Sequence, residues 1–230
     1  MTELRRTAAL GVAASLLLLT GCASAPAAPV PSPTWVDLTG YDPERDANGL
    51  SLLAPADART QILADAATAD TTMTVTYQDA SGRPLEVVFT GGGERFSAEV
   101  TADAETTSIV VDGARAAVTP SSAIAAESGI EPGAIACVAA TDELVTRWQP
   151  LLDPAGFIAD ATTDASGLGA PQDGAVELLL GEDGTAGVLS VSTTGPALPS
   201  ELIRADESGT VHALFSGWGA AEPLALPDDC

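Results

Sequence analysis

The chain has 230 residues, of which 32 are acidic and 9 are basic, and its formal net charge is −23 with no lysine present. Nucleic-acid binding needs clustered Lys and Arg side chains that displace counterions from phosphates, so this composition excludes nucleic acid as a partner. Hydrophobic residues make up 46% of the chain and aromatic residues only 4%, which is sufficient for a core but disfavours binding faces built from stacked rings.

Residues 1–21 have the layout of a secretory signal peptide. Arg5 and Arg6 precede an apolar run from Ala8 to Leu19, whose twelve residues are fewer than the about 20 that a membrane-spanning helix needs. The run ends in Leu19-Thr20-Gly21-Cys22, which resembles the lipobox of bacterial lipoproteins. That resemblance implies an exported protein whose Cys22 carries acyl chains, such as palmitate, at the outer face of the bacterial cell membrane. In the other interpretation, Cys22 is an ordinary small residue after a conventional cleavage site.

Residues 22–34 are expected to be the lipidated cysteine and a tether. The segment ASAPAAPVPSPT contains four prolines and shows no hydrophobic periodicity. At about 3.1 Å per residue in polyproline II, it would span roughly 35 Å. We expect residues 35–230 to form a single domain, which its negative charge keeps away from anionic lipid headgroups.

The first half of this domain predicts one helix followed by strands. In PADARTQILADAAT (55–68), Pro55 suits a first helical turn and Ile62, Leu63 and Ala66 share one face. Apolar and polar residues then alternate, which predicts strands in MTVTYQ, PLEVVFT, RFSAEVT and TSIVVD. Glycine-containing turns separate these strands at spacings near ten residues, which indicates an antiparallel meander.

The second half predicts two helices followed by strands. TDELVTRWQP (141–150) has Thr141 or Asp142 as a cap and Pro150 as its end, and DPAGFIADA (153–161) forms a second short helix. Strand patterns follow in AVELLLG, GVLSVST, SELIRAD and TVHALFSG. The order of elements predicts an α+β fold with the helices packed against one sheet. Three short helices cover only part of such a sheet, so the sheet either curls on itself or leaves an apolar hollow.

Cys137 and Cys230 are the cysteines that remain besides Cys22. In an exported protein an even pair is typical of a disulfide, but pairing requires Cα atoms within about 7 Å. The sequence therefore leaves two alternatives: one disulfide, or a buried Cys137 and a frayed terminal Cys230.

The end of the chain carries a family resemblance. VHALFSGWGAAEPLALPDD (211–229) resembles the closing strand and tail of LolA-like bacterial lipoproteins, especially the actinobacterial LppX/LprG type. Further similar stretches are SIVVDGARAAV, RWQPLLDPAGFI and VSTTGPALPSELIRADESG, so the likeness covers most of residues 50–228. Ala114, Arg115 and Ala116 depart from the pattern, because many relatives place an aromatic and a basic residue there.

This resemblance implies a curved antiparallel sheet, an incomplete barrel, with a few short helices packed on its concave face around an apolar cavity. The cavity of relatives takes acyl chains of lipids, glycolipids or lipoproteins, so the resemblance implies lipid binding or transport in the cell envelope. Apolar side chains of the strands and helices are the expected lining, with ordinary core packing as the alternative for each of them. These candidates are Val75, Tyr77, Val87, Phe89, Val100, Val111, Leu144, Trp148, Phe157, Leu178, Leu180, Leu189 and Val191.

No catalytic residues are expected. His212 is the only histidine, the chain lacks a G-x-S-x-G nucleophile elbow, and a zinc site with one histidine and two spare cysteines is disfavoured. We therefore expect a monomer that is not an enzyme, holds no metal or cofactor, and has lipids and an envelope transporter as partners. The alternative is a structural or interaction lipoprotein with a filled interior.

Overall fold

The computed structural model describes residue 38 and residues 41–220, 224–228 and 230. Residues Asp37–Cys230 form one compact unit. The expected signal peptide, Cys22 and the tether lie outside the described residues. Within the described part of the chain, no helix has both the length and the apolar character needed to cross a membrane.

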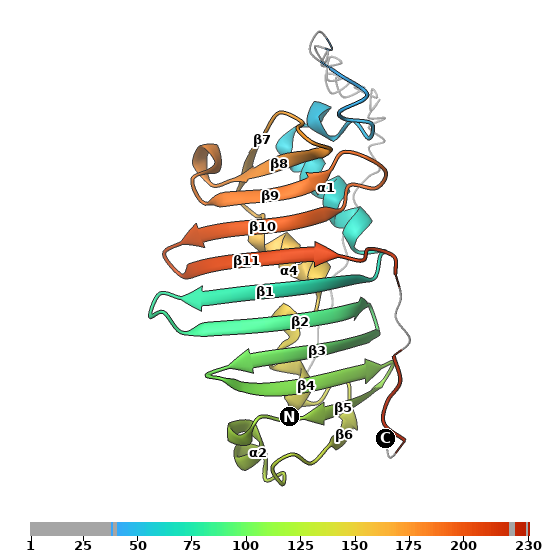
Figure 1. Ribbon diagram of the computed structural model, residues 1–230, viewed down its shortest axis with the longest axis vertical. Coiled ribbons are helices and arrows are strands. Elements are labelled where there is room, and N and C mark those ends of the chain that lie inside the picture. Colours follow the sequence, from blue (N-terminus) through green and yellow to red (C-terminus); the bar gives the residue numbers. More distant parts are fainter. Residues whose placement is uncertain (1–37, 39–40, 221–223, 229) are drawn as a thin grey trace, which may run out of the picture. The chain divides into compact units, whose positions relative to one another are not determined.

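Eleven strands of the described residues form one antiparallel sheet (Figure 1). The strands are β1 (Thr71–Asp79), β2 (Pro84–Gly92), β3 (Arg95–Ala102), β4 (Glu105–Asp112), β5 (Arg115–Thr119), β6 (Ala136–Ala139), β7 (Ala165–Leu168), β8 (Ala175–Leu180), β9 (Gly187–Ser192), β10 (Pro199–Asp206) and β11 (Gly209–Ser216). Their order is β6-β5-β4-β3-β2-β1-β11-β10-β9-β8-β7. The sheet is therefore open, with β6 and β7 at its two edges and the β1–β11 pair joining its two halves.

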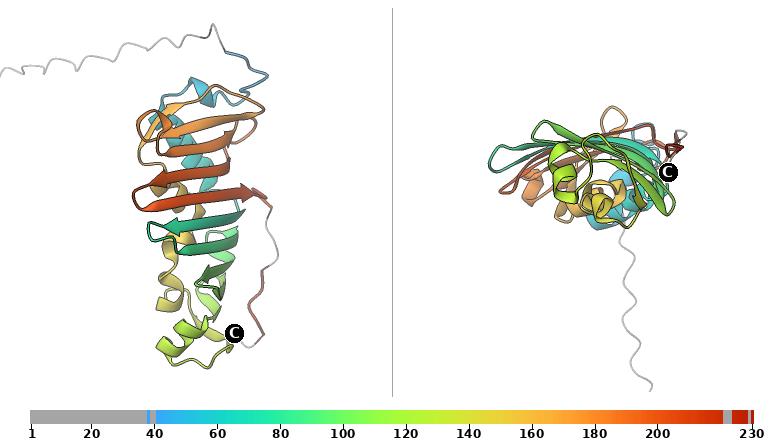
Figure 2. Two further views of the ribbon diagram at one scale, coloured as in Figure 1. Left: turned by 60° about the vertical axis from the view of Figure 1, so that its left-hand side comes forward. Right: turned by 90° about the horizontal axis from the view of Figure 1, so that it is seen from below.

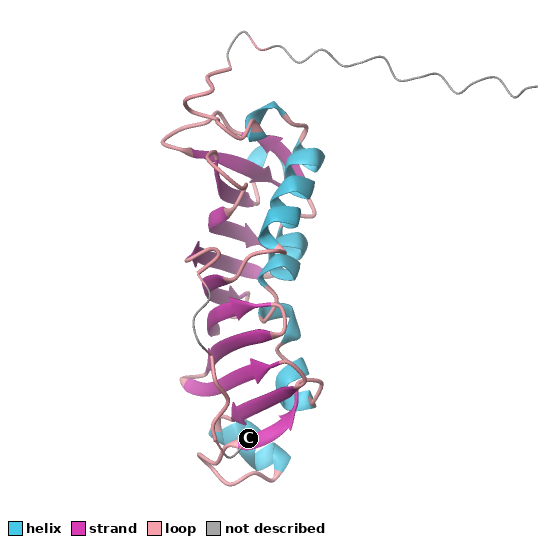
Figure 3. Ribbon diagram, turned by 90° about the vertical axis from the view of Figure 1, so that its right-hand side faces the viewer, coloured by secondary structure: helices cyan, strands magenta, loops and turns pink. Residues whose placement is uncertain are grey.

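Short helices lie on one face of this sheet. They are the α-helices α1 (Pro55–Ala66), α2 (Ser122–Ser128), α3 (Glu143–Thr146) and α4 (Pro154–Ala161), and the 3-10 helices η1 (Leu50–Leu52) and η2 (Gln149–Leu151). A further 3-10 helix, η3 (Glu182–Gly184), lies in the connection between β8 and β9. Seen from below, the sheet curves around α1 and α4, which occupy its concave side (Figure 2). The side view shows the helices stacked along one side of the strands (Figure 3).

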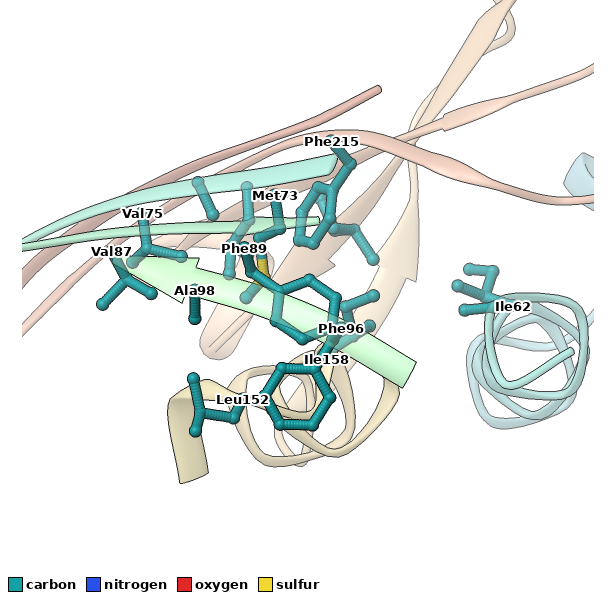
Figure 4. Packing of buried hydrophobic residues seen from close by; sticks show 14 of the residues in the cluster. Ile62, Met73, Val75, Val87, Phe89, Phe96, Ala98, Leu152, Ile158 and Phe215 are labelled. Atoms are coloured by element: carbon teal, nitrogen blue, oxygen red, sulfur yellow. The ribbon is translucent and has the colours of Figure 1, made fainter. Parts of the chain in front are cut away.

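The alternating apolar residues of the strands face these helices. The strand register places Val75 between Val87 on β2 and Ala213 on β11, and Met73 between Phe89 and Phe215. All six of these side chains are at most 5% exposed. The labelled strand residues point toward the helices, where Leu152 and Ile158 lie beside Phe96 (Figure 4). The core is thus a continuous layer between the concave face and the helices.

The predicted α+β fold is confirmed, as is the open, curved sheet with short helices that the resemblance implies. Each predicted strand is present, because alternation with period two identifies half-buried strands. The helix expected over residues 141–150 is instead broken into α3 and η2, with Pro150 inside η2. Strands β5, β6 and β7 and helix α2 were not predicted from the sequence.

Residue Cys230 lies at the β6 edge of the sheet, although the chain leaves the sheet at the end of β11 (Figure 1). Arg95 donates through Nη2 to the carbonyl oxygen of Leu224 at 3.1 Å, and Arg115 donates through Nη1 to that of Cys230 at 2.6 Å. Cys137 on β6 and Cys230 form a disulfide with Cα atoms 5.3 Å apart, which resolves the alternatives that the sequence left open.

Arg204 on β10 connects the sheet to the end of α4. Its Nη1 donates to the carbonyl oxygen of Ala161 at 2.8 Å and to Asp164 Oδ1 at 2.7 Å, and its Nε donates to Asp206 Oδ2 at 3.0 Å. Hydrogen bonds from Arg204 lower the pKa of Asp164. Hydrogen bonds from the hydroxyl and the backbone N–H of Ser208, followed by that from Arg204, lower the pKa of Asp206 to about 2. Both carboxylates are therefore more acidic in the folded state than in an unfolded chain.

We expect these carboxylates to make stability depend on acid pH. A carboxylate with a lowered folded-state pKa contributes stability that is present above about pH 4 and is lost as pH falls toward 2. Asp206→Asn should cost about 0.5–1 kcal/mol at pH 7, because solvent screens a side chain that is 35% exposed. Urea unfolding between pH 7 and 2.5 should show that the variant loses less unfolding free energy over this range than the unaltered protein does. The exposed neighbour Glu207 provides the control variant Glu207→Gln. If this control reduced the pH dependence of stability as much as Asp206→Asn does, the assignment of the effect to Asp206 would be contradicted.

Candidate functional site

A pocket of about 610 Å³ lies at the β6 end of the described sheet, between the concave face and two helical segments. Its residues come from the β3–β4 hairpin, from α2 and the residue before it, and from α3 and the two residues after it. We call it the α2 pocket, and it is lined by Val100, Ala102, Asp103, Glu105, Thr107, Ser121, Ala123, Ile124, Glu127, Glu143, Arg147 and Trp148. Its size falls within the range of roughly 300–1,000 Å³ that is usual for small-molecule sites.

Helix α2 forms one wall because both of its ends are fixed by local sequence. The Ser121 hydroxyl caps the first turn by accepting from the backbone N–H of Ile124 at 3.5 Å, and Gly129 ends the helix with φ 68°. Two side chains of β4 hold its beginning in place. Thr107 Oγ1 accepts from the backbone N–H of Ser121 at 3.0 Å, and Glu105 Oε2 accepts from that of Ala123 at 3.1 Å.

The opposite wall follows from the early end of α3. Asp142 caps this helix by accepting from the backbone N–H of Leu144 at 3.0 Å, and Leu144 and Val145 are buried against the core. The backbone turns into η2 after Trp148, where Pro150 cannot donate a helical hydrogen bond. Arg147 and Trp148 are thereby placed at the pocket.

An ion-pair cluster links the two walls. Arg147 Nη1 lies 3.2 Å from Glu127 Oε2 on α2, and Arg147 Nη2 lies 3.7 Å from Glu143 Oε1 on α3. The same three residues also line a second pocket of about 540 Å³, the β6 pocket, whose other lining residues are Ser128, Ile130, Ala136, Val138, Asp142 and Leu144. The cluster thus separates two hollows at one end of the concave face.

The turn at the pocket mouth holds alanine in an unfavourable conformation. The β3–β4 hairpin pairs Ala102 with Glu105, and its two turn residues, Asp103 and Ala104, have φ of 50° and 65°. Such a turn favours glycine at its second position, because a Cβ is disfavoured in the left-handed region.

Ala104→Gly should therefore raise the free energy of unfolding by about 0.5–1 kcal/mol. The matched control is Ala64→Gly on the exposed side of α1, where glycine should lower it by about 1 kcal/mol. Urea titrations of both variants check the opposite signs. A loss at position 104 as large as that at position 64 would contradict the described turn.

The structure places most of the expected cavity residues in the filled core. Val75, Val87, Phe89, Val100, Val111, Leu144, Leu178, Leu180, Leu189 and Val191 are all at most 7% exposed. Tyr77, Trp148 and Phe157 are half-buried. The Tyr77 hydroxyl donates to the carbonyl oxygen of Ser208 at 3.1 Å, and Phe157 packs against the core cluster. Of the expected residues, Val100 and Trp148 line the α2 pocket.

Most lining residues of this pocket were not among the sequence-based candidates. Among the elements that line it, α2 was overlooked, because this helix has seven residues and only Ala125 is buried on it. Its boundaries could have been recognised from the capping residue Ser121 and from Gly129, which have the favoured types for helix ends. The charged lining residues had no sequence signal, because single carboxylates at turns and on exposed helix faces are usually solvated.

Comparison with solved structures finds similarity to a mycobacterial protein, whereas comparison with families and curated sequences finds none. No protein-family model matches the chain, and no curated protein sequence matches it. Among solved structures, the chain is similar to LprF from Mycobacterium bovis, with 14% sequence identity and a TM-score of 0.41. The match covers 76% of this chain and 99% of the LprF chain.

Proposed function

We propose that this chain is an exported lipoprotein, anchored through Cys22 to the outer face of the bacterial cell membrane, which binds acyl chains of lipids or glycolipids. The signal-peptide layout and the Leu19-Thr20-Gly21-Cys22 sequence support the export and the anchor. The α2 pocket is the proposed binding site, and it is the observation that carries the proposal. An envelope transporter would be its partner in lipid transfer, and the chain itself would act as a monomer without catalysing a reaction.

The lining of the α2 pocket suits part of an acyl chain. Val100 and Ala102 come from β3, Ile124 comes from α2, and Trp148 follows α3, so three segments of the chain contribute apolar residues to the pocket. Each methylene transferred from water to such surface gains about 0.8 kcal/mol without any directional contact. Binding therefore requires no catalytic or metal-binding group.

The experiment uses residues 23–230, because all described core residues lie between Leu50 and Phe215 and the disulfide joins residues 137 and 230. Native mass spectrometry of gently purified protein should detect a bound lipid, and liposomes with a labelled lipid should transfer it to the protein. The absence of both signals would contradict the proposal.

A pocket-filling variant shows where the lipid binds. Ala102→Phe adds a ring on the inward face of β3, where aromatic residues are well tolerated in strands. Thr101→Phe is the matched control, because the adjacent residue of a strand points to the opposite face. We expect Ala102→Phe to reduce lipid uptake at least tenfold and Thr101→Phe to leave it unchanged. Equal uptake by the two variants would place the lipid elsewhere.

One observation favours a second candidate function, a structural or interaction lipoprotein with a filled interior. The centre of the concave face is packed, and the outer face carries the exposed side chains of Val88, Ile203 and Leu214, which are 37%, 47% and 47% exposed. These residues lie on β2, β10 and β11, around the central strand β1. Failure of lipid binding together with normal folding would favour this second function.

A further inference from the structure

The α2 pocket has an unequal distribution of charge. Its lining includes the four carboxylates of Asp103, Glu105, Glu127 and Glu143, and a single guanidinium, that of Arg147. Four negative charges against one positive charge leave the lining with a net charge of −3. When an amphiphile buries its apolar chain in this pocket, its head group must remain near these carboxylates. The affinity should therefore depend on the charge of the head group.

The only cation of the lining already has partners. Arg147 contacts Glu127 at 3.2 Å and Glu143 at 3.7 Å, and its side chain is 25% exposed. An anionic head group would have to displace these carboxylates from Arg147 and would then face both of them at close range. Neighbouring Asp103 and Glu105 would add to the repulsion. The arginine is therefore a poor site for an anion.

A cationic head group would find complementary chemistry in the same place. Asp103 is exposed at the turn, and Glu143 keeps 86% of its side chain exposed although it lies near Arg147. The indole of Trp148 lines the same pocket, and tryptophan is the aromatic side chain that binds ammonium groups best through its ring face. Carboxylates beside an indole are the residue types that recognise an ammonium group.

We infer that the α2 pocket selects amphiphiles with a cationic ammonium head over those with an anionic head. This inference rests on the proposed function, since it names the class of ligand for the same pocket. The specificity-determining residues are Asp103 and Glu143, and Trp148 provides the aromatic surface for the ammonium group.

Three probes with the same chain length test the inference: dodecyltrimethylammonium, dodecyl maltoside and dodecanoate. Each is titrated calorimetrically into residues 23–230 below the concentration at which it forms micelles. Binding that is lost in Ala102→Phe but kept in Thr101→Phe is assigned to the α2 pocket. We expect the ammonium probe to bind there at least tenfold more tightly than dodecanoate, with the maltoside between them. Added salt should reduce this difference.

Charge variants separate the effect of the pocket from that of the acidic chain as a whole. The preference for the ammonium probe is measured as the logarithm of the ratio of its affinity to that of dodecanoate. The double variant Asp103→Asn/Glu143→Gln should reduce this logarithm by at least two thirds. Asparagine is suitable at position 103 because it tolerates the φ of 50° found there. The control Glu86→Gln/Glu99→Gln makes the same change in net charge on the exposed outer face and should leave the difference intact.

The outcomes distinguish this inference from the proposed function. Equal binding of the three probes in the pocket, or tighter binding of dodecanoate, would overturn the charge preference and leave acyl-chain binding in place. An equal effect of the two double variants would also overturn it. If no probe shows binding that depends on Ala102, both the charge preference and the proposed function fail.

Discussion

Phe89→Ala should lower the free energy of unfolding by about 3–5 kcal/mol, one of the largest effects expected for a single substitution in this chain. Phe89 is 1% exposed, and its ring stacks on that of Phe96 with centroids 5.3 Å apart. It pairs with Met73 on β1 and with Ala98 on β3, so it lies in the layer that joins the sheet to the helices. Truncation removes apolar burial and leaves a cavity that these neighbours only partly fill.

The adjacent residue provides a matched control for this prediction. Val88 lies on the outer face of the same strand and is 37% exposed, so Val88→Ala should change stability by about 0.5 kcal/mol or less. Urea titrations at 25 °C with equal m-values would measure both effects on one scale. Similar losses of stability at positions 88 and 89 would contradict the described register of β2, in which Phe89 faces the core and Val88 faces outward. A register shift of one residue would exchange these two faces.

The same contrast between faces explains how much of the fold could be predicted from sequence. Strong alternation identified the long strands, and Met73, Val75 and Phe89 are buried where the pattern placed them. The short edge strand β6 has only four residues, too few for a period to be recognised. Topology was also beyond the pattern, since the pairing of β1 with β11 joins segments far apart in the chain.

The candidate site was less predictable than the fold, for a physical reason. Alternation shows that Val75 and Leu178 face inward, but it does not show whether a helix covers them. That depends on where α1 and α4 pack, and their buried side chains belong to the same core cluster as the inward residues of the strands. Figure 3 shows the helices along this side of the sheet. The α2 pocket, which Val100 and Trp148 line, lies instead beside the shorter helices α2 and α3. Pocket position is thus a property of tertiary packing rather than of local sequence.

Removing the disulfide should be the other large effect. Cys137 and Cys230 are 93 positions apart in the sequence, and in the chain-entropy model a crosslink that closes a loop of that size raises the free energy of the unfolded chain by about 4.6 kcal/mol. The double variant Cys137→Ser/Cys230→Ser should therefore lose about 2–5 kcal/mol of unfolding free energy. Replacing both cysteines avoids leaving a free thiol that could form dimers.

The loss should arise from the crosslink rather than from the polar contacts of the tail. Arg115→Ala removes the hydrogen bond from Nη1 to the Cys230 carbonyl oxygen. Because this hydrogen bond is exposed to solvent, it should contribute about 1 kcal/mol or less to stability. Urea titrations of the oxidised protein, the reduced protein and both variants would separate the two contributions. The reduced protein should have the same unfolding free energy as the double serine variant, and reducing conditions should not change the stability of that variant. If the double variant were as stable as the oxidised protein, the crosslink would contribute nothing to holding β6 at the edge of the sheet. The β6 pocket, which Ala136 and Val138 of that strand line, would then need no crosslink to persist.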